Sequence, residues 1–268
     1  MSEPRSPRTF LICHEEERLN RYALPRWLGS FSTFTGVLVI KEPWRSKSRR
    51  AKREVRRVGF LRFLDVLAFR VWYKLFVNGR DRRWERGTFR ELCVNYPEVD
   101  ASVPVLETST PNTRRCERFI RRCHPDIMIA RSKYILKDRI FRIPLKGTFV
   151  MHPGICPEYR NAHGCFWALA GSDLDSVGMT LLRIDRGVDT GPVFGYYTCN
   201  YDEAKDSHIV IQEKTVFDNL ERLADKLTAL ANGVAFPIDT TGRRSAAWGQ
   251  PTLTAYLRWK RAAKGRAR

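Results

Sequence analysis

The chain has 268 residues, 43% of them hydrophobic, which is enough to bury the core of one α/β domain with a small appendage. Its formal net charge of +19 favours an anionic partner, such as nucleic acid, a membrane surface or a phosphorylated substrate. The seven cysteines form no CxxC pair and have no zinc-site spacing, which excludes a disulfide framework and predicts free thiols in a reducing cytosol. Residues 1–8 are polar and contain no apolar signal segment, so we expect a cytoplasmic protein.

The first forty residues predict a strand, a helix and a second strand. Residues 8–13 are apolar and short, and residues 19–31 have helical spacing. Residues 36–40 form a continuous apolar run, which is typical of a strand buried on both faces of a parallel sheet. This β-α-β opening predicts an α/β fold with a doubly wound, mostly parallel sheet. No GxGxxG motif follows the first strand, so the dinucleotide-binding fingerprint is absent.

Residues 45–90 form a strongly basic insertion around an apolar stretch, residues 60–77. Four charged residues interrupt this stretch and fall within about half a turn of a helical wheel, which predicts an amphipathic helix rather than a membrane span. Two interpretations stay open. The helix lies on an anionic membrane or grips an anionic substrate, or it is a core helix with a solvated charged face. The four charged residues are Arg62, Asp65, Arg70 and Lys74.

The remaining elements complete the predicted sheet and end in a basic tail. We expect residues 1–235 to form the α/β domain, with a C-terminal helix, and residues 236–268 to form a basic C-terminal extension. Asn232-Gly233 provides a helix stop signal before that extension. The predicted strands are 103–107, 127–130, 147–150 and 193–199, and the predicted helices are 113–123 and one long helix over 210–230.

Two polar segments follow apolar runs and carry the candidate chemistry. Residues 151–160, MHPGICPEYR, come just after a predicted strand, where open α/β sheets place their ligands. A histidine at that position, His152, can act as a general acid or base near neutral pH. Residues 181–192, LLRIDRGVDTGP, form a second apolar run that ends in a glycine-bearing loop with the carboxylates Asp185 and Asp189.

These segments, together with Trp167-Ala168-Leu169 and Gly178-Met179-Thr180, resemble the folate-dependent formyltransferase family. The family pattern is a strand with Asn-x-His-Pro, then Pro-x-Tyr/Phe-Arg-Gly, Trp-Ala-(Leu/Ile), Gly-x-Thr and (Val/Ile)-Asp-Thr-Gly. The match covers about residues 125–195. The resemblance implies a Rossmann-like formyltransferase core and 10-formyltetrahydrofolate as the co-substrate, with no metal.

The resemblance also implies roles for individual residues. His152 would bond the formyl oxygen or its developing charge, and Asp189 would hold the environment of His152 and assist proton transfer through water. Ile135 and Leu136 would wall the pteridine pocket, although ordinary core residues are the alternative. The implied cofactor-binding residues are Ile135, Leu136, Gly154, Pro157, Ile184, Asp185 and Val188, and the implied substrate-binding residues are Tyr159 and Arg160.

One position departs from the family pattern, because Val150 stands where the family has its catalytic Asn. Valine cannot donate a hydrogen bond, and loss of one oxyanion donor typically costs about 10²–10³ in rate. Thr148 on the same strand face, or Asn161 or His163 in the following loop, is a candidate replacement donor. Cys156 is not expected to act as a nucleophile, because the resembled mechanism uses no covalent enzyme intermediate.

The resulting hypothesis is formyl transfer to a primary amine of a small molecule, with a nucleotide- or lipid-linked amino sugar as the favoured acceptor. Transfer RNA is less favoured, because the family members that act on it resemble this core followed by a C-terminal barrel. One alternative is a hydrolase that releases formate from formyltetrahydrofolate. Another is a catalytically degenerate member that binds nucleic acid, or an anionic membrane on its cytoplasmic face through residues 45–90.

Overall fold

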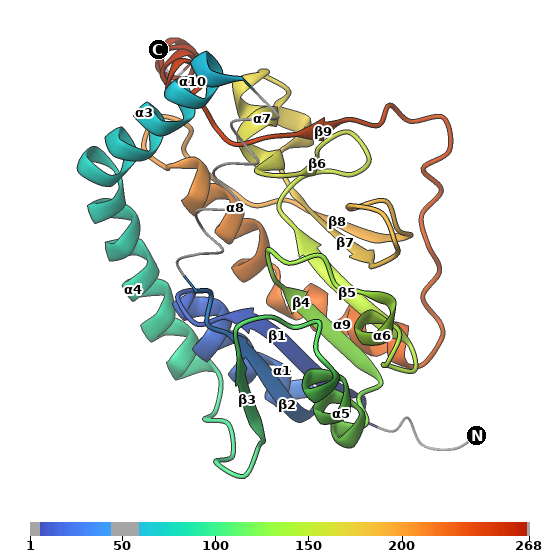
Figure 1. The fold of residues 1–268 in the computed structure, drawn as a ribbon. Coiled ribbons are helices and arrows are strands. Elements are labelled where there is room, and N and C mark those ends of the chain that lie inside the picture. The colour runs from blue at the N-terminus through green and yellow to red at the C-terminus, as the bar shows by residue number, and fades with distance from the viewer. Residues whose placement is uncertain (1–5, 44–58, 267–268) are drawn as a thin grey trace.

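The computed structural model describes residues 6–43 and 59–266 (Figure 1). Residues 45–57, the first part of the predicted basic insertion, lie outside these ranges. Within them, seven strands form one sheet in the order β3-β2-β1-β4-β5-β7-β8, and two short strands, β6 and β9, pair separately. The strands are β1 Arg8–His14, β2 Thr33–Ile40, β3 Val105–Thr108, β4 Ile127–Arg131, β5 Gly147–His152, β6 Arg160–Asn161, β7 Met179–Arg183, β8 Val193–Tyr197 and β9 Ala247–Trp248.

Helices connect these strands and cover the sheet (Figure 1). A π-helical turn, Leu19–Ala23, leads into α1, and a 3-10 turn, Leu174–Ser176, precedes β7. The helices are α1 Leu24–Phe31, α3 Phe60–Phe76, α4 Asn78–Asn95, α5 Arg114–Cys123, α6 Asp138–Phe141, α7 Gly164–Ala170, α8 His208–Phe217, α9 Leu220–Ala231 and α10 Leu253–Arg266.

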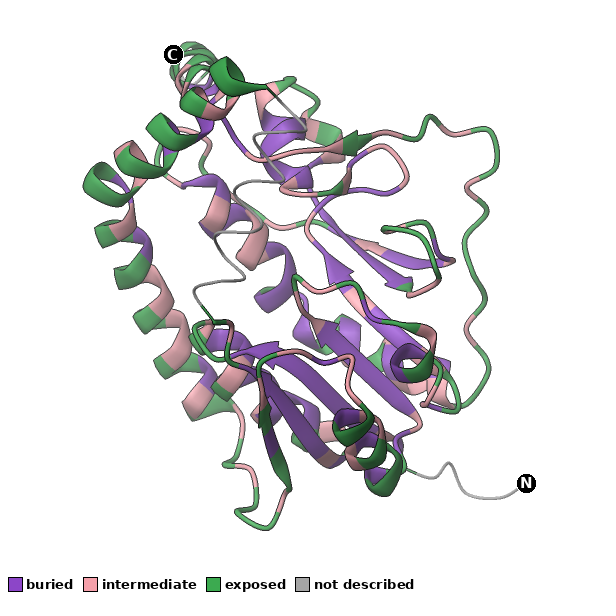
Figure 2. Ribbon diagram, in the orientation of Figure 1, coloured by how far each residue is buried: buried purple, intermediate pink, exposed green. Residues whose placement is uncertain are grey.

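The sheet is parallel from β3 to β5 and antiparallel at the β7–β8 edge. β1, β2 and β4 are its most buried strands, as Figure 2 shows in purple, because their continuous apolar runs are covered on both faces. The predicted α/β fold with a mostly parallel sheet is therefore confirmed. The direction of β7 could not be inferred from its residues, since a fully apolar run fits either orientation.

Two apolar cores lie on opposite faces of the sheet. On one face Leu11 and Ile129 pack with Trp27 of α1 and Leu223 of α9. On the other face Ile12 and Met128 pack with residues of α5 and α6, including Ile120 and Phe141. Since successive strand residues point to opposite faces, each apolar strand contributes alternate residues to the two cores.

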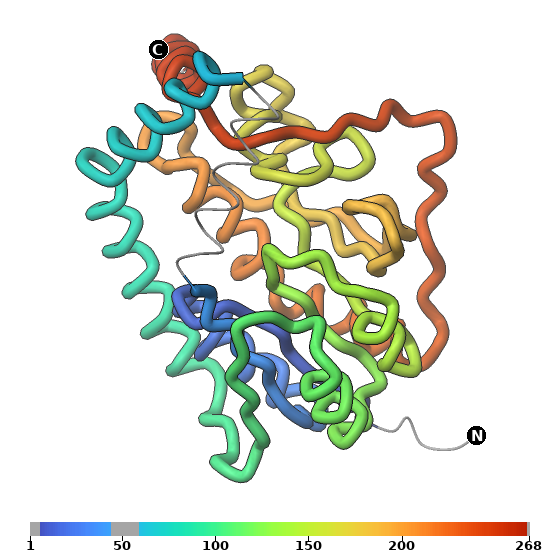
Figure 3. The backbone as a smooth tube through the Cα atoms, viewed as in Figure 1, coloured from blue at the N-terminus to red at the C-terminus, as the bar shows by residue number. Residues whose placement is uncertain are grey.

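The tail beyond residue 252 folds onto the domain as helix α10. Tyr256 and Trp259 of α10 are each 1% exposed and pack with Phe69 of α3 and Phe166 of α7. Tyr256, Trp259 and Ala263 recur at helical spacing, which gives this basic segment one apolar face. We define residues 232–252, between α9 and α10, as the C-terminal strap; the tube in Figure 3 shows it returning from α9 to α10 along one side of the molecule.

The prediction of a single helix over residues 210–230 is wrong, because the chain forms α8 and α9 with a break at Asp218 and Asn219. Asn219 is buried, and its amide donates hydrogen bonds to the carbonyls of Thr198 at 2.8 Å and Thr215 at 3.1 Å. An Asn side chain that bonds to nearby backbone groups competes with the helix, which accounts for the break.

Trp27 joins α1 to α9, because its ring is 1% exposed and its Nε1 donates to the Leu220 carbonyl at 3.0 Å. We expect Trp27→Ala to lower the free energy of unfolding by about 3–5 kcal/mol, through the cavity and the unpaired carbonyl that it leaves. Urea unfolding followed by circular dichroism measures this loss. Tyr22→Ala is the control, since Tyr22 is 50% exposed; equal losses in both variants would contradict the packing described.

Candidate functional site

His152 is the last residue of β5, and both of its ring nitrogens face oxygen atoms. Nε2 lies 2.8 Å from the Tyr159 carbonyl, and Nδ1 lies 3.3 Å from Oδ2 of Asp189. A carbonyl only accepts, so Nε2 carries a hydrogen in this contact. The side chains are 4% and 15% exposed. With the Nε2 hydrogen directed at this carbonyl, Nδ1 faces the Asp189 carboxylate.

Asp189 reaches His152 because the loop between β7 and β8 runs back along β5. The loop starts beside Thr148, whose carbonyl accepts from the Ile184 N–H at 2.8 Å, and it ends beside His152. Asp189 adopts a left-handed backbone conformation, with φ of 53°, which Asp tolerates better than most residues. The Asn161 N–H donates to Oδ2 of Asp189 at 2.8 Å and fixes the carboxylate.

The predicted cofactor residue Asp185 shapes this loop from within. Its Oδ1 accepts from the Gly187 N–H at 2.9 Å and from the Thr190 hydroxyl at 2.8 Å. Both bonds are local, as in an Asx turn. The structure therefore places Asp185 as the residue that shapes the turn, and Val188, 40% exposed, near its tip.

Gly154 and Pro157 shape the loop that follows β5. A Cβ at Gly154 would lie 2.5 Å from the Tyr159 carbonyl and 2.8 Å from the Cα of Gly164, so only glycine fits this close approach. The peptide bond before Pro157 is cis. Burial raises the pKa of the neighbouring Cys156 thiol well above its usual range, so this thiol stays protonated, as expected for a residue that is not a nucleophile.

Ile135 and Leu136 line a cavity of about 510 Å³. Leu136 is buried and shares an apolar cluster with Phe141 and Ile184, whereas Ile135 is 68% exposed at the cavity. Arg186, in the loop that also carries Asp189, borders the same cavity. The structure thus brings Ile135, Leu136 and Ile184 together. The other lining residues are Lys137, Asp138 and Arg139.

Tyr159 is built into the core beside the site. Its hydroxyl donates to Asp173 at 2.7 Å, and its ring stacks on Trp248 with centroids 5.7 Å apart. Arg160 lies at the surface of the site, where Nε donates to the Ser245 hydroxyl at 2.9 Å and Nη1 donates to the Val188 carbonyl at 3.0 Å. Of the two predicted substrate residues, Arg160 therefore keeps N–H groups for a ligand, whereas the hydroxyl and both backbone groups of Tyr159 are engaged within the protein.

Sequence reasoning missed the C-terminal strap as part of the site. Arg243 of the strap forms a bidentate ion pair with Glu158, with both N···O distances 2.8 Å. Trp248 donates from Nε1 to the Glu158 carbonyl at 2.9 Å and stacks between Tyr159 and Trp167. An isolated tryptophan beside glycine was the only hint in the sequence, and it does not identify a partner.

The surroundings of Val150 are apolar, and two of the three candidate replacement donors are committed elsewhere. Val150 packs against the cluster of Cys156, Leu182 and Val193. The Thr148 hydroxyl donates to the Phe141 carbonyl at 2.7 Å, and the Asn161 amide donates to the Trp248 carbonyl at 2.5 Å. Burial lowers the pKa of His163 to about 4, which leaves this ring neutral at pH 7 with one N–H. Its Nδ1 is buried and has no hydrogen-bond partner among the described residues.

No group of three or more His, Cys, Asp or Glu residues in the described ranges could hold a metal ion. The candidate site therefore consists of one histidine–aspartate pair, a loop held by hydrogen bonds and a cavity that the β7–β8 loop borders through Arg186.

Comparison with known proteins finds formyltransferases both by sequence and by structure. No family model matches the chain. The chain is 31% identical over 118 residues to methionyl-tRNA formyltransferase of Dehalococcoides mccartyi (strain CBDB1), a match that covers 42% of this chain and 37% of that protein. Phosphoribosylglycinamide formyltransferase from Anaplasma phagocytophilum has a similar structure, with a TM-score of 0.54 and 11% identity over 92% of this chain and 100% of that one. A sugar N-formyltransferase from Shewanella sp. FDAARGOS_354 has a TM-score of 0.53 and 11% identity over 95% of this chain and 87% of that one.

The fold is therefore that of the formyltransferases, a mostly parallel seven-stranded sheet among the described residues, flanked by helices. The sequence relatives are formyltransferases as well, which confirms the resemblance to the formyltransferase family. The chain spans less than half the length of the curated relatives that it matches.

Two buried histidines behind the site predict a pH-dependent stability. His208 is 1% exposed, its ring lies 5.6 Å from that of His163, and burial lowers the pKa of both. The unfolded chain then binds more protons below pH 6.5, so we expect stability to fall as the pH drops from about 6.5 to 4. The slope should reach about 1.4 kcal/mol per pH unit for each histidine.

Urea unfolding at a series of pH values measures this dependence. His208→Phe should flatten it, because phenylalanine keeps the aromatic packing without the titrating group. His124→Asn, at an exposed histidine, is the control and should leave the slope unchanged. An identical slope in wild type and His208→Phe would contradict the assignment.

Proposed function

We propose that this protein transfers a formyl group from 10-formyltetrahydrofolate to a primary amine. The single observation that carries the proposal is the contact between His152 Nδ1 and Asp189, made at the carboxyl end of β5. The loop that carries Asp189 also borders the cavity of Ile135 and Leu136, through Arg186. Formyl transfer needs a donor for the developing negative charge and a group that takes the proton of the amine. A histidine held against a carboxylate supplies both kinds of group.

The cavity suits a folate. Leu136 and Phe141 form an apolar wall for a flat heteroaromatic ring, with Ile184 packed against their cluster, and Lys137 and Arg139 provide cationic groups for carboxylates. Ile135, Leu136, Ile184 and Val188 would hold the ring system, and Gly154, Pro157 and Asp185 would act through the shape of the two loops. When bound, the folate supplies an activated formyl group.

The chain's own residues would orient the reactants and manage one proton. The Tyr159 carbonyl holds the ring of His152, and the Asn161 N–H holds Asp189, so both side chains are in place before the reactants bind. Asp189 would receive the proton that the amine loses, directly or through water. His152 would stabilise the charge on the formyl oxygen by exchanging its Nε2 hydrogen bond to the Tyr159 carbonyl for one to that oxygen. The loops on either side would limit access of bulk water to the pair.

The acceptor that we favour is a primary amine on an amino sugar carried by a nucleotide or a lipid. The support is the net charge of +19, together with Arg160 at the edge of the site, whose remaining N–H groups suit a phosphate. Nucleic acid is a less favoured partner. A second candidate is a degenerate family member that has no transferase activity, and the apolar packing of Val150 favours it. A third is a hydrolase, in which water replaces the amine as the acceptor of the formyl group.

An Asp189→Asn variant tests the proposed proton acceptor. We expect the rate of tetrahydrofolate formation in the presence of a nucleotide-linked amino sugar to fall by about 10²–10⁴, because the amide cannot take a proton. Calorimetric titration with 5-formyltetrahydrofolate should still show binding. Asp175→Asn, the same change at an exposed aspartate, is the control. Absence of transfer to nucleotide-linked and lipid-linked amines alike, with the folate bound, would refute the transferase, and formate release without an amine would identify the hydrolase.

A Val150→Asn variant tests the missing donor. If the rate is limited by the absence of a hydrogen bond at this position, Asn should raise the rate constant for transfer by about 10²–10³. Val150→Leu, similar in volume to Asn but without a donor, is the matched control and should give no increase. A lower rate in both variants would show that apolar packing at Val150 matters more than the absent donor.

A further inference from the structure

Helix α3 is apolar on the side that faces solvent, which a core helix does not require. Its inner side carries Phe69 and Trp72, whose rings lie 5.3 and 5.1 Å from that of Tyr256 in α10. We define the α3 outer face as the seven large apolar side chains that remain exposed. They are Phe60 (66%), Leu61 (82%), Leu64 (42%), Leu67 (44%), Val71 (53%), Leu75 (70%) and Phe76 (69%).

Five of the seven residues of the α3 outer face form one continuous stripe rather than scattered exposure. At 100° per residue, the positions of Phe60, Leu64, Leu67, Val71 and Leu75 fall within about 80° of the helical wheel. The helix has 17 residues, so the stripe is about 25 Å long. A contiguous apolar surface of this length marks an interaction site. Figure 2 shows α3 mostly in the colour of exposed residues along the edge of the molecule.

The charged residues of α3 lie beside this stripe or on the opposite side of the helix. A core helix with a solvated charged face would instead carry its charges on the exposed side. Asp65 accepts hydrogen bonds from the backbone and the hydroxyl of Thr254 in α10. Arg70 and Lys74 are exposed and flank the stripe on one side. The two sides of α3 are thus a packed aromatic side and an apolar outer side with basic residues at its border.

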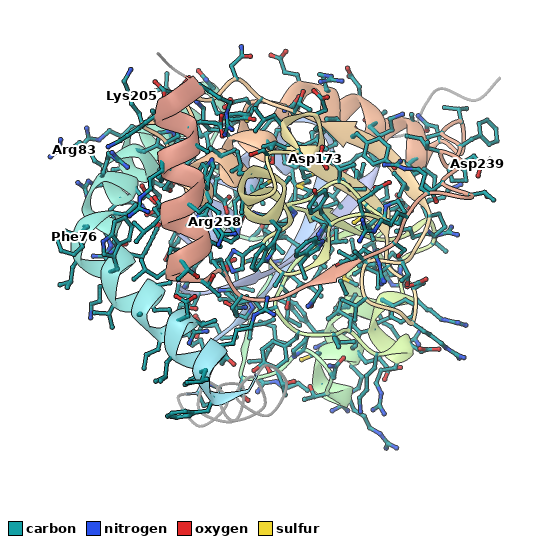
Figure 4. All side chains as sticks on the ribbon, turned by 90° about the horizontal axis from the view of Figure 1, so that it is seen from above. Phe76, Arg83, Asp173, Lys205, Asp239 and Arg258 are labelled. Atoms are coloured by element: carbon teal, nitrogen blue, oxygen red, sulfur yellow. The ribbon has the colours of Figure 1, made fainter. Side chains whose placement is uncertain are left out.

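Helix α4 continues from α3 and presents a basic surface. Arg82, Arg83, Arg86 and Arg90 are exposed and fall within about 100° of the wheel; we call them the α4 basic face. Figure 4 shows Phe76 and Arg83 on the same side of the molecule, pointing away from its body. The apolar end of α3 and the basic face of α4 therefore lie on one side of the molecule, where the two helices join.

We propose that the α3 outer face and the α4 basic face dock on an anionic phospholipid bilayer. An amphipathic helix buries such a stripe at the boundary of headgroups and acyl chains, and each basic residue near an anionic surface adds attraction. None of the described helices is long and apolar enough to cross a membrane, so the contact is peripheral. This inference goes beyond formyl transfer and does not depend on it.

Charge complementarity favours lipid over a second copy of the chain. A two-fold interface brings the same patch of both copies together, so the α4 arginines would approach their equivalents in a chain of net charge +19. A bilayer that contains phosphatidylglycerol offers negative headgroups to these arginines and an acyl region to the leucines. It therefore satisfies both parts of the surface at once.

Flotation of the full chain with vesicles tests the proposal. We expect binding to phosphatidylcholine vesicles that contain phosphatidylglycerol, and weaker binding without phosphatidylglycerol or at high salt. The double variant Leu64→Glu/Leu75→Glu should lower partitioning by about tenfold or more, because two charges enter the apolar stripe. Leu145→Glu/Val234→Glu, at residues 82% and 65% exposed elsewhere, is the matched control and should bind like wild type.

A second pair of variants tests the basic face. Arg82→Ser/Arg86→Ser should abolish the preference for phosphatidylglycerol, whereas Arg114→Ser/Arg118→Ser, with the same spacing on the exposed side of α5, should keep it. No binding of wild type to the anionic vesicles would overturn the proposal. So would a wild-type dimer in sedimentation velocity that Leu64→Glu/Leu75→Glu converts to monomer, since a second copy would then cover the stripe. Unchanged thermal midpoints of the variants would show that they remain folded.

Discussion

The hydrogen bond between His152 Nε2 and the Tyr159 carbonyl is the contact on which the site depends. It closes the loop after β5 onto the end of that strand, and the close approach of Gly154 and Gly164 leaves no room for a side chain inside the turn. The next two residues of the loop then hold the opposite loop, since Arg160 bonds the Val188 carbonyl and the Asn161 N–H bonds Asp189. The contact of His152 is buried, where a polar group without a partner is costly, so it holds the loop from which Arg160 and Asn161 make the other two contacts.

The C-terminal strap connects this loop to the edge of the molecule where α3 lies. The Ala246 N–H donates to the Pro157 carbonyl at 3.1 Å, and the Arg160 N–H donates to the Ala246 carbonyl at 3.0 Å, so strap and loop form a short ladder. The strap then leads into α10, whose Tyr256 packs on Phe69 and Trp72 of α3. The site and the α3 outer face therefore belong to one packed unit, joined through backbone hydrogen bonds and aromatic contacts rather than through a flexible linker.

The sequence predicted what short-range patterns determine. The runs of β1, β2 and β4 are apolar because both faces of the sheet are covered, and a histidine directly after such a run had to lie at the carboxyl end of a strand. The break at Asn219 was not predictable, since one of its bonding partners, Thr198, lies 21 residues earlier. The position of the C-terminal strap at the site was not predictable for the same reason, because Arg243 pairs with Glu158, which lies 85 residues earlier. The sequence of α3 is as apolar as that of a core helix, so it does not show that one apolar side stays exposed. The exposed fractions of the side chains distinguish the two sides of the helix, whereas the helical wheel does not.

The distribution of charge explains how one chain can combine a net charge of +19 with a selective site. At the cavity, Asp138 pairs with Arg186 at 2.8 Å, and this guanidinium lowers the pKa of the Asp138 carboxyl, so part of the local positive charge is neutralised. Glu158 neutralises Arg243 in the same way. Among the described residues, no ion pair neutralises the exposed arginines of the α4 basic face. Long-range attraction thus acts at the edge of the molecule, where it draws the chain toward an anionic surface. At the site, the positive charge is partly neutralised, so a ligand is recognised by shape and by individual hydrogen bonds. Salt weakens these contacts less than it weakens the attraction of the exposed arginines.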